Sequence, residues 1–117
     1  MSESLSSFDE PLVVLFDDER RFISGFRDGA IVLRTVAEAR RFFDYLKLTK
    51  HPVSELWLDF VIGRGNVTEA LSDLPGELVE RAFYHSSGIA GRSLVETWLK
   101  RQGFTGELEL PEGQQFE

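Results

Sequence analysis

The sequence contains no cysteine, one methionine and four prolines, and it has no long uninterrupted apolar run. Without cysteine, a disulfide-stabilised scaffold, a zinc ribbon and a thiol nucleophile are all excluded. A membrane-spanning helix needs about 20 consecutive apolar residues, and a secretory signal needs a basic region followed by an apolar one. Neither pattern occurs, so we expect a cytoplasmic protein with no membrane partner.

The sequence also lacks an excess of basic residues. It has 13 Lys and Arg against 20 Asp and Glu, which gives a net charge of -7. Duplex DNA binding requires a basic surface, so we expect no such partner. The acidity is nevertheless local, because residues 1–10 contribute -3 and residues 107–117 contribute -4, which together make -7. Residues 11–106 are balanced, with 13 acidic and 13 basic side chains, and a phosphate-bearing ligand remains compatible with them.

The chain of 117 residues has the length of one domain, since compact domains cluster near about 100 to 150 residues. Residues 1–10 and 111–117 are polar and without periodicity, which predicts a flexible segment at each end. Between them, residues 11–110 carry a dense apolar pattern and are predicted to form a single α/β domain.

Short apolar runs alternate with amphipathic segments along this domain. The predicted strands are 12–16, 30–33, 55–62, 82–84 and 107–110. The predicted helices are one that follows Thr35, whose spacing to Glu38 fits a capping box, one within 66–80 and one that runs to Lys100. Strands that alternate with helices indicate parallel βαβ units, so we expect a mainly parallel open sheet of about five short strands with helices on both faces.

Acidic residues follow the first predicted strand, and another acidic residue lies within the third. In an open α/β sheet, ligands bind outside the carboxyl ends of the strands. If those two strands are neighbours, Asp17, Asp18 and Asp59 converge there, and three carboxylates together favour a hard divalent cation such as Mg²⁺. The alternative is that Asp17 and Asp18 only form the turn after the strand and that Asp59 is half exposed.

The fourth predicted strand ends in His85, Ser86 and Ser87, and a helix that contains Gly91 and Arg92 follows. A helix N-terminus offers free amides, and hydroxyl and guanidinium groups can bind phosphate oxygens, so Ser86, Ser87, Gly91 and Arg92 are candidate phosphate-binding residues. The alternative is simple N-capping by a serine. His85 is either a general acid or base, or a histidine whose hydrogen bonds are satisfied within the fold.

Four segments together carry a family resemblance. The order LVVLFDDER, VLRTVAEA, LWLDF with Gly63 close behind, and YHSSGIAGR resembles the cyclic-phosphate processing receivers, which are relatives of response-regulator receiver domains, over residues 12 to about 102. The resemblance implies a receiver or flavodoxin-like fold and a role in signalling. It also implies Mg²⁺ bound by Asp17 and Asp18, with Asp59 as a third ligand or phosphoacceptor.

Under the same resemblance, His85, Ser86 and Arg92 would face the phosphate, and His85 would protonate a leaving oxygen or orient water. The chain departs from the family at two places. Its third strand continues as Asp59-Phe60-Val61-Ile62-Gly63, where the family usually has Asp-His-Asp-Leu-Gly. Leu110-Pro111 stand where response-regulator receivers have a lysine. Both departures weaken the case for turnover and leave a metal pocket possible.

The sequence therefore leaves three functions open. The first is Mg²⁺-dependent binding or processing of a phosphate or cyclic phosphate. The second is a degenerate receiver that acts as a protein-interaction or regulatory module, with Phe22, Phe26 and Trp57 as candidate surface anchors. The third is recognition of a nucleotide or an RNA end, in which arginines rim the acidic crevice; the candidates are Arg20, Arg21, Arg27 and Arg34.

Overall fold

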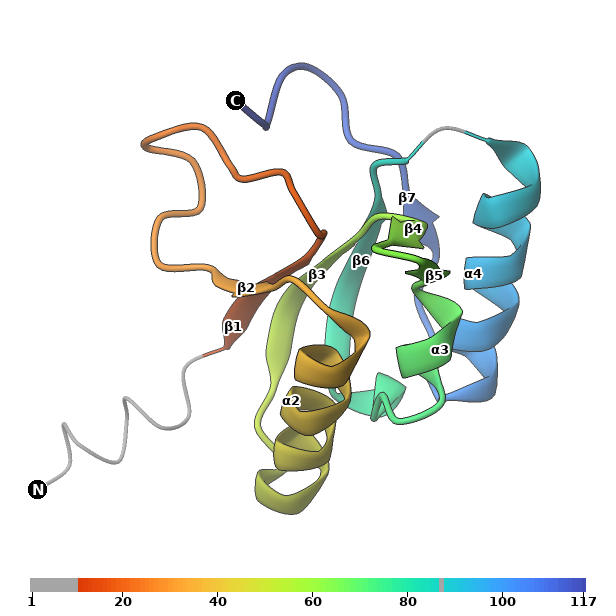
Figure 1. The fold of residues 1–117 in the computed structure, drawn as a ribbon. Coiled ribbons are helices and arrows are strands. Elements are labelled where there is room, and N and C mark those ends of the chain that lie inside the picture. The colour runs from red at the N-terminus through yellow and green to blue at the C-terminus, as the bar shows by residue number, and fades with distance from the viewer. Residues whose placement is uncertain (1–10, 87) are drawn as a thin grey trace, which may run out of the picture.

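A five-stranded parallel sheet forms the centre of the molecule (Figure 1). The computed structural model describes residues 11–86 and 88–117. The strands of the sheet are β1 (Leu12–Phe16), β2 (Ile31–Leu33), β3 (Val53–Leu58), β6 (Val79–Tyr84) and β7 (Leu108–Glu109). They lie in the order β2-β1-β3-β6-β7, and every neighbouring pair is parallel. The predicted α/β class with a mainly parallel open sheet is confirmed.

The remaining elements connect these strands. The helices are α2 (Val36–Thr49), α3 (Thr68–Leu71), a 3-10 turn (Gly76–Leu78) and α4 (Ile89–Arg101), and β4 (Val61–Ile62) pairs with β5 (Gly65–Asn66) as a small hairpin. Over the described residues, no helix has both the length and the apolar composition that crossing a membrane requires.

Helix α2 begins as its sequence predicts. The Thr35 hydroxyl accepts a hydrogen bond from the Glu38 amide at 3.0 Å, which satisfies one of the free amides of the first turn. The Glu38 carboxylate accepts from the amide of Arg34 at 2.8 Å, one residue before the position that a capping box uses. The two side chains therefore cap both the helix and the turn that leads into it.

Two predicted elements are shorter than the sequence indicates. The strand expected over 55–62 ends at Leu58, and the Asp59 carboxylate accepts a hydrogen bond from the amide of Phe60 at 2.8 Å, so the chain turns into the hairpin. The helix expected within 66–80 is only α3 and the 3-10 turn. Pro75 separates them because it has no amide to continue the helix.

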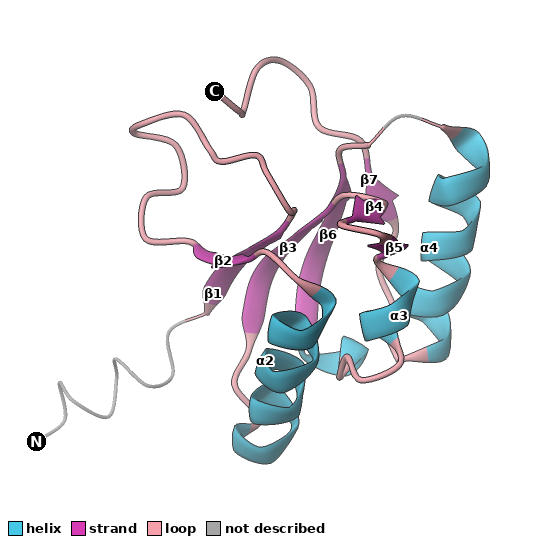
Figure 2. Cartoon of the chain, viewed as in Figure 1, coloured by secondary structure: helices cyan, strands magenta, loops and turns pink. Residues whose placement is uncertain are grey.

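The helices cover one face of the sheet (Figure 2). Buried residues of that face form one core cluster to which α2, α3 and α4 all contribute. The fully buried members include Phe16 of β1, Phe43 of α2 and Leu99 of α4. This face is mostly aliphatic, and the periodicity of the helices identifies its inward residues.

The other face is covered without a helix, as far as the described residues show. Its cluster consists of Leu15, Trp57 and Phe83, one residue each from β1, β3 and β6, with aromatic rings of the segments 17–30 and 111–117 packed against them. The expectation of helices on both faces is therefore wrong for the described chain. Segment 17–30 lacks a helical period, and large aromatic rings from loops bury the inner strands in place of helices.

Residues 111–117 also differ from the prediction of a flexible end. Phe116 and Phe22 form an antiparallel β-bridge, the Gln115 carbonyl accepts from the amide of Ile23 at 2.9 Å, and the Glu117 amide donates to the carbonyl of Arg21 at 3.1 Å. The reason is long-range pairing, which leaves no local pattern in a short polar segment.

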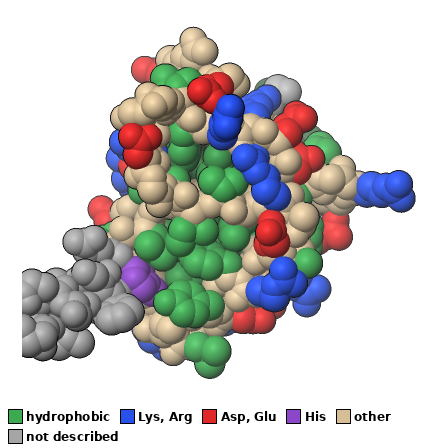
Figure 3. All heavy atoms as spheres, turned by 60° about the vertical axis from the view of Figure 1, so that its left-hand side comes forward, with side chains coloured by type: hydrophobic (Ala, Val, Ile, Leu, Met, Phe, Trp, Pro, Cys, Tyr) green, Lys and Arg blue, Asp and Glu red, His purple; other side chains and the backbone are tan. Residues whose placement is uncertain are grey.

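The two edges of the sheet differ in polarity. At the β7 edge, Arg81 pairs with Glu109 at 2.7 Å across the surface. At the β2 edge, Val32 is 38% exposed. Figure 3 brings the side of β2 forward and shows hydrophobic side chains at the surface with charged ones around them.

Candidate functional site

Strand register aligns three predicted site residues at one end of the sheet. Phe16 lies opposite Leu58, and Leu58 lies opposite Tyr84. The ladder continues one step further, since the Asp59 amide donates to the carbonyl of Phe16 and the His85 amide donates to the carbonyl of Leu58, each at 3.1 Å. The residues that follow the three strands are therefore level with one another.

The Asp17 carboxylate is completely buried and accepts three hydrogen bonds. Its Oδ1 accepts from the amides of Glu19 and Arg20, both at 2.9 Å, and its Oδ2 is 2.8 Å from Nε2 of His85. Burial raises the pKa of Asp17, but the hydrogen bond from His85 and the two amide hydrogen bonds outweigh it and lower the pKa to about 2. Asp17 is therefore ionised at neutral pH, and it orients the imidazole of His85.

The His85 side chain is only 2% exposed, and it packs against aromatic rings. The centroid of its ring lies 4.6 Å from that of Phe116 and 6.4 Å from that of Trp57. Nε2 faces Asp17, whereas Nδ1 is buried with no hydrogen-bond partner among the described residues. The predicted His85 thus belongs to the site, where it is paired with a carboxylate.

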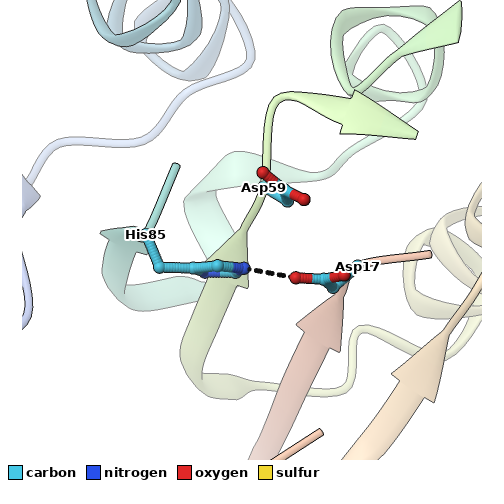
Figure 4. Close-up of side chains that lie close together, drawn as sticks. All are labelled: Asp17, Asp59 and His85. Carbon is cyan, nitrogen blue, oxygen red and sulfur yellow. Dashed lines mark hydrogen bonds and ion pairs between the residues drawn. The ribbon is translucent and has the colours of Figure 1, made fainter. Parts of the chain in front are cut away.

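Asp59 completes a three-residue cluster. Figure 4 shows its carboxylate at the end of β3 beside the pair formed by His85 and Asp17. The three residues offer ligand atoms that all lie within 4.8 Å of one another. Two carboxylates and an imidazole at this spacing can hold a metal ion. The expected convergence of Asp17 and Asp59 is confirmed.

Asp18 is not part of this cluster, contrary to the predicted set of three carboxylates. Its Oδ2 instead accepts a hydrogen bond from the amide of Gly63 at 2.9 Å, which ties β1 to the turn of the hairpin. Gly63 has a positive φ of 58°, a backbone conformation that favours glycine. The Asp17 side chain lies in the cluster and the Asp18 side chain faces the hairpin, so His85 rather than Asp18 is the third residue of the cluster.

Two of the four predicted rim arginines lie at the cluster. The Arg20 guanidinium donates to the carbonyl of His85 at 3.2 Å, and the Arg34 guanidinium donates to the carbonyls of Asp17 and Arg20. These contacts fix the backbone of the site and place positive charge beside its carboxylates. The other two pair elsewhere: Arg21 with Glu117 and Arg27 with Glu55.

The four predicted phosphate-binding residues have three different outcomes. Ser86 and Arg92 line a hollow of about 130 Å³ at the start of α4, together with Tyr84, Gly88, Ile89 and Leu110. Gly91 has a packing role instead, because a Cβ at this position would lie 2.6 Å from Oη of Tyr84. Ser87 lies outside the described residues.

The hollow and the cluster share an uncommon feature, namely buried polar atoms without partners. Within residues 11–86 and 88–117, such side-chain atoms are Oη of Tyr84, Nδ1 of His85 and Nε of Arg92. Each unsatisfied group costs about 1 to 3 kcal/mol. Tyr84 ends β6, His85 follows it, and Arg92 lies in the first turn of α4, where its Nε is 3.9 Å from a Glu96 carboxylate oxygen. This end of the molecule therefore has unused hydrogen-bonding capacity.

One residue of the site, Phe116, is absent from the predictions. Its ring packs against that of His85 at a tilt of 45°. It also lines an open cleft of about 310 Å³ with Tyr84, His85, Ser86, Leu110, Pro111, Gly113 and Gln115. The only signal in the sequence is a single aromatic residue within the polar run PEGQQFE.

The candidate surface anchors of an interaction module lie in the core or against it. Trp57 is 2% exposed, and its Nε1 donates to the Glu55 carboxylate at 2.9 Å. The rings of Phe22 and Phe26 pack edge-on to that of Trp57, with centroids 5.2 and 5.9 Å away. These residues therefore build the helix-free face rather than a free docking surface.

Comparison with known proteins adds no relative. No family model, no curated protein and no solved structure matches the chain.

Proposed function

We propose that the domain binds a phosphate-bearing ligand with the help of a divalent cation at the carboxyl ends of β1, β3 and β6. The observation that carries the proposal is the convergence of Asp17, Asp59 and His85, whose ligand atoms lie within 4.8 Å of one another. The sequence resemblance to cyclic-phosphate processing receivers supports the same assignment. The proposal concerns binding first, since His85 is engaged by Asp17 and is almost fully buried.

The donor set fits a divalent cation and favours some over others. Ligand distances of about 2.0 to 2.2 Å allow donor atoms to be at most about 4.4 Å apart around one ion. The ligand atoms of the cluster lie within 4.8 Å of one another, so the side chains would have to move slightly closer together to bind an ion. Imidazole suits Zn²⁺ and other transition metals, whereas carboxylates suit Mg²⁺ and Mn²⁺. Because His85 takes the place expected for Asp18, the site should prefer Mn²⁺ or Zn²⁺ to Mg²⁺. Such an ion would offset carboxylate charge and polarise a phosphoryl oxygen.

The protein's own groups supply the remainder of the site. Asp17 stays ionised because its pKa is held at about 2, so it remains anionic across the physiological range. Ser86, which follows His85 directly in the chain, and Arg92 line the hollow at the start of α4 and offer a hydroxyl and a guanidinium to phosphate oxygens. The N-terminus of α4 adds a partial positive charge at the same place.

The metal component is tested by isothermal titration of the natural protein with Mn²⁺, Zn²⁺ and Mg²⁺. We expect Mn²⁺ or Zn²⁺ to bind more tightly than Mg²⁺, and Asp59→Asn to weaken binding by at least about tenfold through loss of an anionic ligand. The matched control is Asp44→Asn, which removes the same charge from an exposed site on α2. Equal affinity in the two variants, or no binding by the natural protein, would contradict the proposal.

The phosphate component is tested separately, with inorganic phosphate and a nucleoside 2′,3′-cyclic phosphate titrated at saturating Mn²⁺. We expect Arg92→Gln to weaken binding of both probes by about tenfold, since a charge-assisted hydrogen bond contributes about 1.5 to 3 kcal/mol. Arg40→Gln, which breaks an exposed pair with Asp73, is the control. Phosphorus NMR of the same samples shows whether the cyclic phosphate is opened to a monoester by water. If neither probe binds, the ligand class is wrong even if the metal binds.

A further inference from the structure

We infer that Phe116 is a positioning residue for His85, and that residues 115–117 act as a latch that keeps the imidazole on Asp17. The inference rests on the proposed function only in taking His85 as a residue of the site. Residues 115–117 belong to a segment for which the sequence predicts no structure. They lie at the opposite end of the described chain from β1.

The packing of His85 depends on two rings. Phe116 lies with its centroid 4.6 Å from that of the imidazole at an interplanar angle of 45°, and Trp57 lies 6.4 Å away. The His85 side chain is 2% exposed. Trp57 is held in place by strand β3. Phe116 lies outside the sheet, and its bridge to Phe22 holds it near the site. Loss of the Phe116 ring would therefore open the imidazole to solvent.

Phe116 is held in place from both sides. Its ring stacks on that of Phe22 at a centroid distance of 5.3 Å and an angle of 13°. The backbone of Gln115 accepts from Ile23, and the backbone of Glu117 donates to Arg21. The Glu117 carboxylate also pairs with the Arg21 guanidinium at 2.6 Å. These contacts define a short latch of residues 115–117 on residues 21–23.

Hydrogen bonding alone does not fix the ring of His85. The imidazole has one partner, the Asp17 carboxylate at Nε2, and Nδ1 has none among the described residues. A second hydrogen bond on Nδ1 would fix the rotation of the ring about its contact with Asp17. That second constraint is missing among the described residues, so packing must supply it. Phe116 is the ring nearest to the imidazole among the aromatic pairs of the described chain, and it can supply that constraint.

The test is nitrogen NMR of the imidazole in the metal-free, full-length protein. In the natural protein we expect a proton on Nε2, shared with the Asp17 carboxylate, that exchanges slowly with water. In Phe116→Ala we expect this proton to exchange at least about tenfold faster, since the covering ring is gone. Phe116→Leu keeps an apolar cover and should restore most of the protection.

Two further variants separate positioning from general stability. Phe26→Ala removes the same atoms from the same aromatic cluster, where Phe26 packs on Phe22 and Trp57. It should leave the imidazole signals unchanged. Glu117→Pro removes the amide that donates to Arg21 but keeps the Phe116 ring, and it should reproduce the faster exchange if Phe116→Ala fails to fold.

The outcome is independent of metal binding because no metal is present. Unchanged proton exchange in both Phe116→Ala and Glu117→Pro would overturn the inference, and so would an equal change in Phe26→Ala. If the natural protein binds no metal but the variants behave as expected, the proposed function fails and the latch stands. If metal binds normally and the imidazole signals do not change, the latch fails alone.

Discussion

The two faces of the sheet are packed by different means. On one face, three helices bury a mostly aliphatic cluster. On the other, rings from two loop segments cover Leu15, Trp57 and Phe83. Side chains alternate along a strand, so residues two positions apart lie on the same face of the sheet. The residues two positions after those three are Asp17, Asp59 and His85. The helix-free face therefore leads directly into the candidate site, while the helix-covered face provides most of the core.

The largest effect should follow from a cavity in the helix-covered face. Phe43 of α2 is fully buried and packs edge-on to Phe16, so Phe43→Ala should lower the free energy of unfolding by about 3 to 5 kcal/mol. Urea unfolding measures this loss. Phe42→Ala, on the partly exposed neighbour, should cost less. A cost for Phe43→Ala no larger than that of Phe42→Ala would show that the helices contribute less than we argue.

The second largest effect is the contribution of Asp17, a residue of the candidate site, to the free energy of unfolding, and it depends on pH. The pKa of Asp17 is about 2 in the folded protein against an ordinary value of 3.8. Its charge therefore stabilises the fold above about pH 4, and this contribution is lost as the pH falls toward 2. The stability gap between the natural protein and Asp17→Asn should shrink by about 2 kcal/mol from pH 5 to pH 2.

Thermal unfolding at a series of pH values measures that gap. Asp44→Asn, which changes an exposed carboxylate on α2, provides the baseline for the loss of one negative charge. A gap between the natural protein and Asp17→Asn that stays constant with pH would mean that the hydrogen bonds of Asp17 do not favour its ionised form.

A smaller and more local effect should follow on the helix-free face. Phe22 is partly buried and contacts Phe26, Trp57 and Phe116, so Phe22→Ala should cost about 1 to 2 kcal/mol. Amide hydrogen exchange should rise at residues 21–26 and 115–117 while α2 stays protected. If protection is lost equally in α2, the two faces unfold as one unit and the contrast between them is only one of composition.

The smallest effect concerns the two ends of α2, one of the helices that cover the sheet. Thr35→Ala removes the hydroxyl that caps α2 and should cost about 1 kcal/mol. Thr49→Ala removes a hydroxyl that donates to the carbonyl of Tyr45 at the other end of the helix, and it should cost less. Chemical denaturation compares the two variants, and the reverse order would show that the cap is not the more important contact.

Much of the sheet and part of the site could be predicted from the sequence. The apolar runs of β1, β3 and β6 end at the same level of the sheet, which explains why Asp17, Asp59 and His85 come together. The sequence could not tell which of Asp17 and Asp18 turns inward, because two backbone amides decide it by binding Oδ1 of Asp17. It also could not reveal the role of Phe116, since pairing with Phe22 depends on the fold and leaves no periodic pattern.

The bridge between Phe22 and Phe116 has a consequence for the order of assembly. The two residues are 116 − 22 = 94 positions apart, and a ribosome makes Phe116 after every strand and helix of the sheet. Contacts between residues so far apart in the chain tend to form slowly, because the entropy of closing the loop opposes them. The contacts that cover His85 are therefore expected among the later ones to form when the protein refolds, after local structure such as α2.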